Sequence, residues 1–220
     1  MTRTLDILFS CFALVLLSPV LLLVSIAVVF SSGRPCLFRQ HRVGLRGRDF
    51  VLLKFRTMTV RPGAEHGSFD PGSAARVTGI GWFLRSWKLD ELPQLWNVVR
   101  GDMSLVGPRP EVRKWVEAYS DRWARVLTVR PGITDPASIR FRNEEDLLAK
   151  SADPEQTYRN KILPIKLDLY EEYIATRSFL GDMVVIVQTA LAVFGIGSQT
   201  MQISEPDSPS GGRHSGNGQH

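Results

Sequence analysis

The first hydrophobic feature of the chain is an uncharged stretch near its start. No residue from Ile7 to Phe30 carries a charge, and most of them are apolar. A helix of these 24 residues would be about 36 Å long, whereas the hydrocarbon core of a bilayer is about 30 Å thick. A cleaved signal peptide would have a shorter apolar region that ends in a small-x-small site, and no such site is found. The pattern therefore predicts a membrane segment.

A proline interrupts this segment at its midpoint. Pro19, preceded by Ser18, lacks a backbone donor, and its ring collides with the carbonyl of Val15, so the helix should bend there. Two arrangements are compatible with a bend. A kinked helix could still cross the bilayer, or a re-entrant helix could dip in and return to the same face, since each half of about 18 Å reaches only mid-bilayer. The residues alone do not choose between them.

Helical spacing returns in the middle of the chain. A helix is predicted to begin near Thr78 and to end near Leu89, because apolar residues recur at helical intervals along it. A second helix is predicted to begin at Asp90 and to end at Gly101, with Pro93 tolerated in its first turn.

The rest of the pattern predicts short elements around further helices. The expected elements are a strand at Phe50–Lys54, a loop at 61–76, helices at Glu111–Val126, Leu147–Ala149, Tyr158–Thr176 and Met183–Phe194, and a disordered tail at 204–220. The segment Met183–Phe194 is too short to span a bilayer, so it is expected in the core or at the membrane interface. The chain is therefore expected to be mainly α with little β.

Charge is distributed unevenly along the chain. The net charge is +5, yet residues 34–61 alone hold eight Arg or Lys and one acidic residue, Asp49. Positive residues next to a membrane segment stay on the cytoplasmic side. Nucleic acid is not an expected partner, because the basic segment adjoins the membrane segment and lacks a recognition helix. The two cysteines, Cys11 and Cys36, form no CxxC pair, which excludes a zinc site or a disulfide framework.

Two adjacent carboxylates are the first candidate chemistry. Asp90 and Glu91 stand at the predicted start of a helix, where Asp90 could simply cap the helix. Alternatively, the two carboxylates could share a divalent metal, and one of them could attack phosphorus. A metal would be needed because a carboxylate that approaches a diphosphate otherwise meets like charge.

A second candidate is an arginine between two prolines. Arg109 lies between Pro108 and Pro110, so its backbone is largely preset and little entropy is lost when its guanidinium binds a phosphate. The alternative is a surface turn with a solvated arginine.

Four segments together closely resemble the small membrane-bound phosphoglycosyl transferases, also called bacterial sugar transferases. They are Phe38–Gly44, Lys54–Met58, Leu84–Asn97 and Gly101–Glu111, and the resemblance covers roughly residues 1 to 195. It implies transfer of a sugar phosphate from a nucleoside diphosphate sugar, usually a UDP-sugar, to undecaprenyl phosphate, with release of UMP. The product would start a glycan on its lipid carrier.

The resemblance also implies roles for individual residues. Asp90 would be the nucleophile that forms a phosphosugar intermediate, Glu91 would bind Mg²⁺ beside it, and Arg85 and Arg109 would bind phosphate. The family's helix-breaking Ser-Pro falls on Ser18-Pro19, which favours the re-entrant arrangement.

The resulting organisation has three parts. Residues 1–33 would form the re-entrant membrane helix, and residues 34–200 a small cytoplasmic α/β catalytic domain with interfacial amphipathic helices. Residues 201–220 would be a disordered tail. The expected location is the cytoplasmic face of a bacterial inner membrane, in contact with membrane lipids.

One departure from the family pattern and two alternatives stay open. Lys88 stands where many members carry a small hydroxyl residue, and it could either add positive charge near the diphosphate or point to solvent. The chain could be an inactive membrane-anchored scaffold of the same fold. It could also transfer sugar without phosphate and release UDP. The motifs specify neither the sugar nor the oligomeric state.

Overall fold

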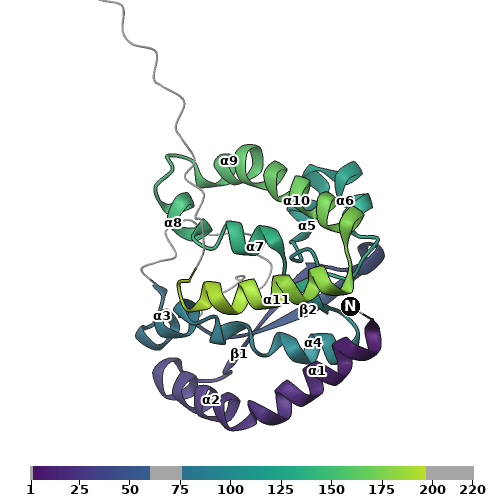
Figure 1. Ribbon diagram of the computed structural model, residues 1–220. Coiled ribbons are helices and arrows are strands. Elements are labelled where there is room, and N and C mark those ends of the chain that lie inside the picture. The colour runs from purple at the N-terminus through teal and green to yellow at the C-terminus, as the bar shows by residue number, and fades with distance from the viewer. Residues whose placement is uncertain (1, 60–75, 197–220) are drawn as a thin grey trace, which may run out of the picture.

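The computed structural model describes residues 2–59 and 76–196, so the expected tail and nearly all of the expected loop at 61–76 lie outside the described residues. Helices dominate the described chain, as predicted, and the strands are few (Figure 1). The helices are α1 Arg3–Leu16, α2 Ser18–Ser32, α3 Gly79–Ser86, α4 Gln94–Arg100, α5 Arg113–Ala118, α6 Ser120–Val126, α7 Pro136–Arg140, α8 Glu144–Ala149, α9 Pro154–Thr157, α10 Leu163–Thr176 and α11 Phe179–Val193. The strands are β1 Leu37–Val43, β2 Asp49–Phe55, β3 Ser104–Val106 and β4 Gly132–Thr134.

The apolar N-terminal segment forms two helices rather than one. α1 and α2 meet at an angle of 63°, which confirms the bend predicted at Ser18-Pro19. The hydroxyl of Ser18 donates to the carbonyl of Val15 at 2.8 Å and so occupies the acceptor that Pro19 leaves without a helical donor. In the described part of the chain, no single helix is long and apolar enough to cross a membrane, whereas this bent pair passes by length and composition.

Polar side chains attach the start of α1 to the rest of the molecule. The guanidinium of Arg3 donates to backbone carbonyls at the end of α4, including that of Val98 at 2.5 Å. Asp6 is buried and accepts from the hydroxyl of Ser104, on β3, at 2.8 Å. The first turn of α1 therefore lies against α4 and β3, which belong to the part of the chain that follows α2 (Figure 1).

The strands form two small sheets. β1 and β2 are an antiparallel hairpin in which Leu37 faces Phe55 and Val43 faces Asp49. β3 and β4 pair in parallel. The predicted strand at Phe50–Lys54 is confirmed as part of β2, whereas β1 was not predicted, because its polar residues obscure the alternation of a half-exposed strand.

The helices in the middle of the chain differ in detail from the prediction. α3 begins after Thr78, as expected, and the hydroxyl of Thr78 caps it by accepting from the backbone of Gly81 at 3.0 Å. It ends at Ser86, before the predicted end near Leu89, whereas α4 ends at Arg100, directly before the expected Gly101. The helix expected from Asp90 instead begins at Gln94. The helix expected over Glu111–Val126 is split into α5 and α6 at Tyr119, whose φ of −139° is not helical.

The main core lies between the helices that follow β3. It is built from buried side chains of α5, α6, α7, α8, α10 and the π turn at Tyr158–Ile162. A second cluster joins α2 to the rest of the molecule, because Val24 and Val28 of α2 pack with Phe55 and Leu84. Burial of these apolar side chains holds α2 against β2 and α3.

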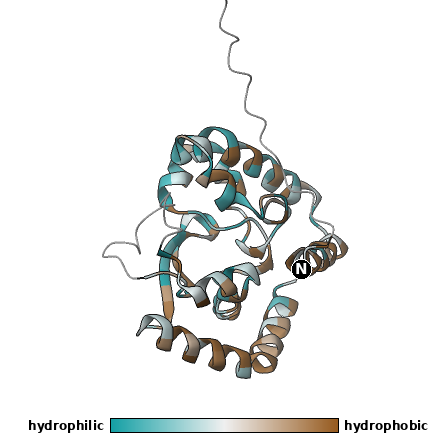
Figure 2. Ribbon diagram, turned by 90° about the vertical axis from the view of Figure 1, so that its left-hand side faces the viewer, coloured by the Kyte–Doolittle hydropathy of each residue, from teal (hydrophilic) through white to brown (hydrophobic). Residues whose placement is uncertain are grey.

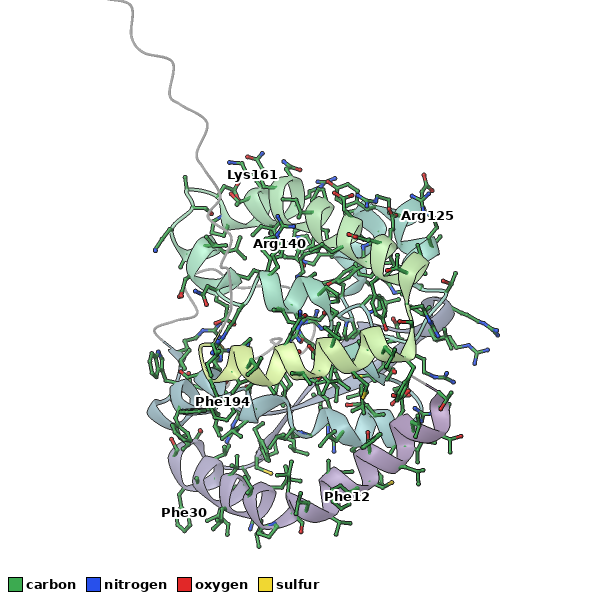
Figure 3. All side chains as sticks on the ribbon, in the orientation of Figure 1. Phe12, Phe30, Arg125, Arg140, Lys161 and Phe194 are labelled. Atoms are coloured by element: carbon green, nitrogen blue, oxygen red, sulfur yellow. The ribbon has the colours of Figure 1, made fainter. Side chains whose placement is uncertain are left out.

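The two ends of the molecule differ in polarity. The bent pair α1–α2 is predominantly hydrophobic (Figure 2). Its exposed side chains include Phe12 and Phe30 (Figure 3). Arg125 and Lys161 lie on the opposite side of the body (Figure 3). α11 also exposes apolar side chains, such as Val187 at 58%, so the segment Met183–Phe194, expected in the core or at an interface, is not a core helix. Exposed apolar area on this scale is typical of a membrane or partner surface.

Candidate active site

The two predicted carboxylates lie in a tight turn between α3 and α4. Asp90 and Glu91 belong to a 3₁₀ turn at Leu89–Glu91, and Lys88 before it has a positive φ of 55°. Both carboxylates are buried. Pro93, not Asp90, precedes α4, and no side chain caps that helix. The capping alternative for Asp90 is therefore wrong, and the burial of two adjacent acids needs another explanation.

Cations surround Glu91. The guanidinium of Arg109 donates to both of its oxygens, at 2.6 and 3.1 Å, and the Lys54 ammonium lies 3.6 Å away. The amide of Gln94 donates to it at 3.2 Å. Burial by itself would raise the pKa of Glu91, but the charges of Arg109 and Lys54 hold this pKa well below its usual range. Glu91 is thus a carboxylate kept ionised inside the protein.

Asp90 has a different environment. Its Oδ1 is buried and has no hydrogen-bond partner among the described residues. Burial, followed by the neighbouring charge of Glu91, raises the pKa of Asp90, while Lys54, Lys88 and Arg85 oppose the rise. An unpartnered buried carboxylate oxygen is costly, and it is typical of a site that awaits a ligand.

Lys54 belongs to this cluster and was not assigned a role from the sequence. It lies on β2, between Leu53 and Phe55. Burial lowers the pKa of Lys54 to about 8, although the charge of Glu91 counteracts the shift. A lysine inside an otherwise apolar strand is the signal that could have identified it, because such a side chain is usually buried only with a partner.

The two arginines expected to bind phosphate are placed differently. Arg109 contacts Glu91 directly, as described above. Arg85, in the last turn of α3, donates from Nε to the hydroxyl of Thr57 at 3.0 Å and pairs with Glu145 at 3.0 Å. Its charge also acts on Asp90. The structure therefore gathers Asp90, Glu91 and Arg109 with Lys54, and it places Arg85 at the edge of the group.

A close backbone approach sets the position of α3 and hence of Arg85. A Cβ added to Gly81 would lie 2.0 Å from the carbonyl oxygen of Thr57, whereas one added to Gly79 meets nothing within 4 Å. Only glycine at position 81 lets the helix lie this near to the chain that follows β2.

Replacement of Gly81 by Ala is expected to destabilise the protein by about 1 to 3 kcal/mol, because the helix must move away from Thr57. Replacement of Gly79 by Ala, in the same helix, is the matched control and is expected to be neutral or stabilising. Thermal unfolding of the purified proteins in detergent, followed by circular dichroism, measures both changes. Equal midpoints for the two variants would contradict the close-approach argument.

The donor set is compatible with magnesium. Groups of three or more His, Cys, Asp or Glu side chains that could hold a metal are absent from residues 2–59 and 76–196. Mg²⁺ is, however, usually held by one or two carboxylates together with phosphate oxygens of a substrate. Asp90 and Glu91 supply such a pair, and the unpartnered Oδ1 of Asp90 is a free oxygen ligand.

Comparison with known proteins places this chain among sugar transferases. Residues 1–195 match the family described as bacterial sugar transferase. The chain is 37% identical over 190 residues to the UDP-glucose:undecaprenyl-phosphate glucose-1-phosphate transferase of Caulobacter vibrioides, an alignment that spans 85% of this chain and 67% of that protein.

Two further relatives extend the comparison. The exopolysaccharide production protein ExoY of Sinorhizobium fredii is 34% identical over 206 residues, which cover 87% of this chain and 84% of ExoY. The UDP-N-acetylgalactosamine-undecaprenyl-phosphate N-acetylgalactosaminephosphotransferase of Aeromonas hydrophila is 34% identical over 199 residues, 88% of this chain. The chain spans less than half of that relative, 44% of its length.

Proposed function

This chain belongs to the bacterial sugar transferase family, and from that premise we propose that it transfers a sugar 1-phosphate from a UDP-sugar to undecaprenyl phosphate and releases UMP. The observation that carries the proposal is the buried pair Asp90–Glu91, in which one oxygen is unpartnered and cations lie alongside. Positive charge around these two carboxyl groups suits an anionic diphosphate substrate. The relatives from Caulobacter vibrioides and Aeromonas hydrophila are named for transfer to undecaprenyl phosphate from UDP-glucose and UDP-N-acetylgalactosamine, respectively.

Asp90 is the proposed nucleophile. One of its carboxylate oxygens attacks the phosphorus attached to the sugar, the bond to the UMP oxygen breaks, and UMP leaves as a phosphate anion. An oxygen of undecaprenyl phosphate then attacks the same phosphorus and releases the Asp90 carboxylate. The unpartnered Oδ1 supports this role, since no hydrogen bond among the described residues must break before it reacts.

The surrounding residues position the charges. Glu91 and Asp90 would hold Mg²⁺, which reduces the repulsion between the nucleophile and the diphosphate. Arg109 and Arg85 would bind phosphate oxygens, and a guanidinium suits this because it donates two parallel hydrogen bonds. In the structure Arg109 makes two such bonds to Glu91, so a phosphate would be bound by its remaining N–H groups. Lys88 is exposed, and its charge acts on both Asp90 and Glu91.

We further propose that α1 and α2 form a re-entrant membrane helix. Two observations support it: the 63° bend between α1 and α2, and the bonds of Arg3 and Asp6 to residues of the catalytic part. A helix that crossed the bilayer would separate Arg3 and Asp6 from these partners by the thickness of the membrane. The catalytic part would then face the cytoplasm, in line with the basic segment after α2.

Replacement of Pro19 by Leu is expected to straighten the segment, because it restores a backbone hydrogen bond and removes a ring clash worth about 3 kcal/mol in a helix interior. A cysteine introduced before Arg3, in a chain lacking Cys11 and Cys36, would report the topology through a membrane-impermeant thiol reagent in intact cells. We expect protection in the parent chain and at least partial labelling with Pro19→Leu, while lysed cells should label both. Efficient labelling of the parent chain in intact cells would refute the re-entrant arrangement.

The reaction itself is tested with the purified full chain in detergent. The assay supplies Mg²⁺, undecaprenyl phosphate and one UDP-sugar from a panel, and it separates UMP from UDP by chromatography. Release of UMP that depends on both substrates is the expected result. Release of UDP would indicate sugar transfer without phosphate, and no release with any sugar would favour the inactive scaffold.

A further inference from the structure

A large apolar cavity lies between the membrane helix and the catalytic part, apart from the candidate active site. It has a volume of about 570 Å³, within the range of roughly 300 to 1,000 Å³ that is usual for ligand pockets. Its lining residues come mainly from α2, the β1–β2 hairpin and α4, which are labelled in Figure 1. Its lining residues are Leu21, Ser25, Cys36, Leu37, Arg39, Val51, Leu53, Phe55, Pro93, Trp96 and Arg100.

The side chains that line the cavity favour a hydrocarbon ligand. Most lining side chains are apolar, and Leu21 and Ser25 belong to the membrane helix itself. A hydrocarbon chain that fills this pocket is removed from water, which is favourable. Trp96, which is half exposed, is a residue type that favours the level of lipid headgroups.

Two arginines give the cavity a charged margin. Arg39 and Arg100 both line it and are both exposed. The Nε of Arg100 lies 3.6 Å from Oδ2 of Asp102, which is too far for a strong hydrogen bond. An apolar pocket with positive charge at its edge is complementary to a lipid that has a hydrocarbon chain and an anionic phosphate headgroup.

Strand alternation indicates which anionic lipid fits. Leu53 and Phe55 line the cavity, while Lys54 between them lies 3.6 Å from Glu91. Successive side chains of a strand point to opposite faces, so the cavity and the carboxylate pair lie on opposite faces of the hairpin. A phosphate at Arg39, which faces Leu53 across the hairpin, is therefore turned away from the proposed nucleophile. This placement suits a resident membrane lipid and not the acceptor of the reaction.

We propose that this cavity binds an acyl chain of an anionic phospholipid, with the headgroup phosphate at Arg39 and Arg100. The bound chain fills the space between α2 and the hairpin and so stabilises the junction of membrane helix and catalytic part. The proposal goes beyond the transferase reaction and does not depend on it.

Cys36 supplies a reporter, because it lines the cavity and is a free, partly exposed thiol. The full chain with Cys11→Ser would be held in detergent micelles and treated with N-ethylmaleimide while dioleoyl phosphatidylglycerol is titrated in. We expect the anionic lipid to slow alkylation of Cys36, and dioleoyl phosphatidylcholine to require a higher concentration for the same protection. Arg39→Gln and Arg100→Gln should each raise the phosphatidylglycerol concentration needed about fivefold.

Arg48→Gln is the matched control, since Arg48 is an exposed arginine of the same basic segment that does not line the cavity. It should leave the titration unchanged. Equal protection by the two phospholipids, or an equal effect of all three arginine substitutions, would overturn the proposal. Protection by undecaprenyl phosphate at lower concentrations than phosphatidylglycerol would overturn it too, because the cavity would then belong to the acceptor.

Discussion

Replacement of Asp90 by Asn is expected to reduce UMP release by a factor on the order of 10⁴ or more, the scale on which removal of a catalytic nucleophile acts. An amide is a far weaker nucleophile than a carboxylate, whereas its size is nearly the same. The fold should therefore survive, and the thermal midpoint should stay close to that of the parent chain. The missing hydrogen bond at Oδ1 means that few contacts of the folded state depend on this oxygen.

The covalent step is measured separately from turnover. The parent chain incubated with Mg²⁺ and a UDP-sugar, without undecaprenyl phosphate, should gain the mass of one sugar phosphate, and Asp90→Asn should gain none. Asp102→Asn is the control, because Asp102 is another partly buried aspartate nearby, bonded to Asn97 at 3.4 Å. Near-normal turnover of Asp90→Asn would exclude the covalent mechanism for this chain.

Replacement of Glu91 by Gln is expected to impair both catalysis and stability. The substitution leaves Arg109 and Lys54 near each other without their shared counter-charge. Breaking a fully buried ion pair costs roughly 3 to 5 kcal/mol. Because 27% of the Arg109 side chain stays exposed, we expect a smaller loss of about 2 to 3 kcal/mol in the free energy of unfolding. Catalysis should fall further, since the proposed metal loses a charged ligand.

Two measurements separate these effects. Unfolding in detergent without metal reports the ion pair, and Glu117→Gln, on the exposed face of α5, is the control that should change little. Turnover as a function of Mg²⁺ concentration reports the metal, and excess Mg²⁺ should restore part of the activity. An unchanged midpoint for Glu91→Gln would contradict the ion-pair argument. Full activity of the parent chain in a strong chelator would exclude the metal.

Residues that act on their own stretch of backbone, such as prolines and helix caps, allowed helix bends and helix termini to be predicted from the sequence. The bend at Ser18-Pro19 follows from the lost donor of proline, the start of α3 follows from Thr78, and the end of α4 follows from Gly101. The acidic pair was also identified locally, as two adjacent carboxylates before an apolar stripe.

Features that depend on contacts between distant segments were not predicted. The ammonium of Lys54 meets Glu91 because β2 passes beside the 3₁₀ turn, and this proximity has no signature in either segment. Arg109 was identified by its flanking prolines, yet its bidentate bond to Glu91 joins residues 18 positions apart. The parallel pair β3–β4 is too short for periodicity to indicate it. Tertiary packing determines such features, and it can override local preference.

The attachment of α1 has a consequence for how the protein is made. Arg3 and Asp6 leave the ribosome before their partners at Val98 and Ser104, which lie 95 and 98 positions later in the chain. At about 5 to 20 residues per second, synthesis of the intervening segment takes on the order of 5 to 20 seconds. Throughout that interval the first turn of α1 is unanchored, while its apolar residues are already available to the bilayer. In the proposed re-entrant arrangement, the order of synthesis therefore lets α1 and α2 enter the membrane before α4 and β3 pack against the start of α1.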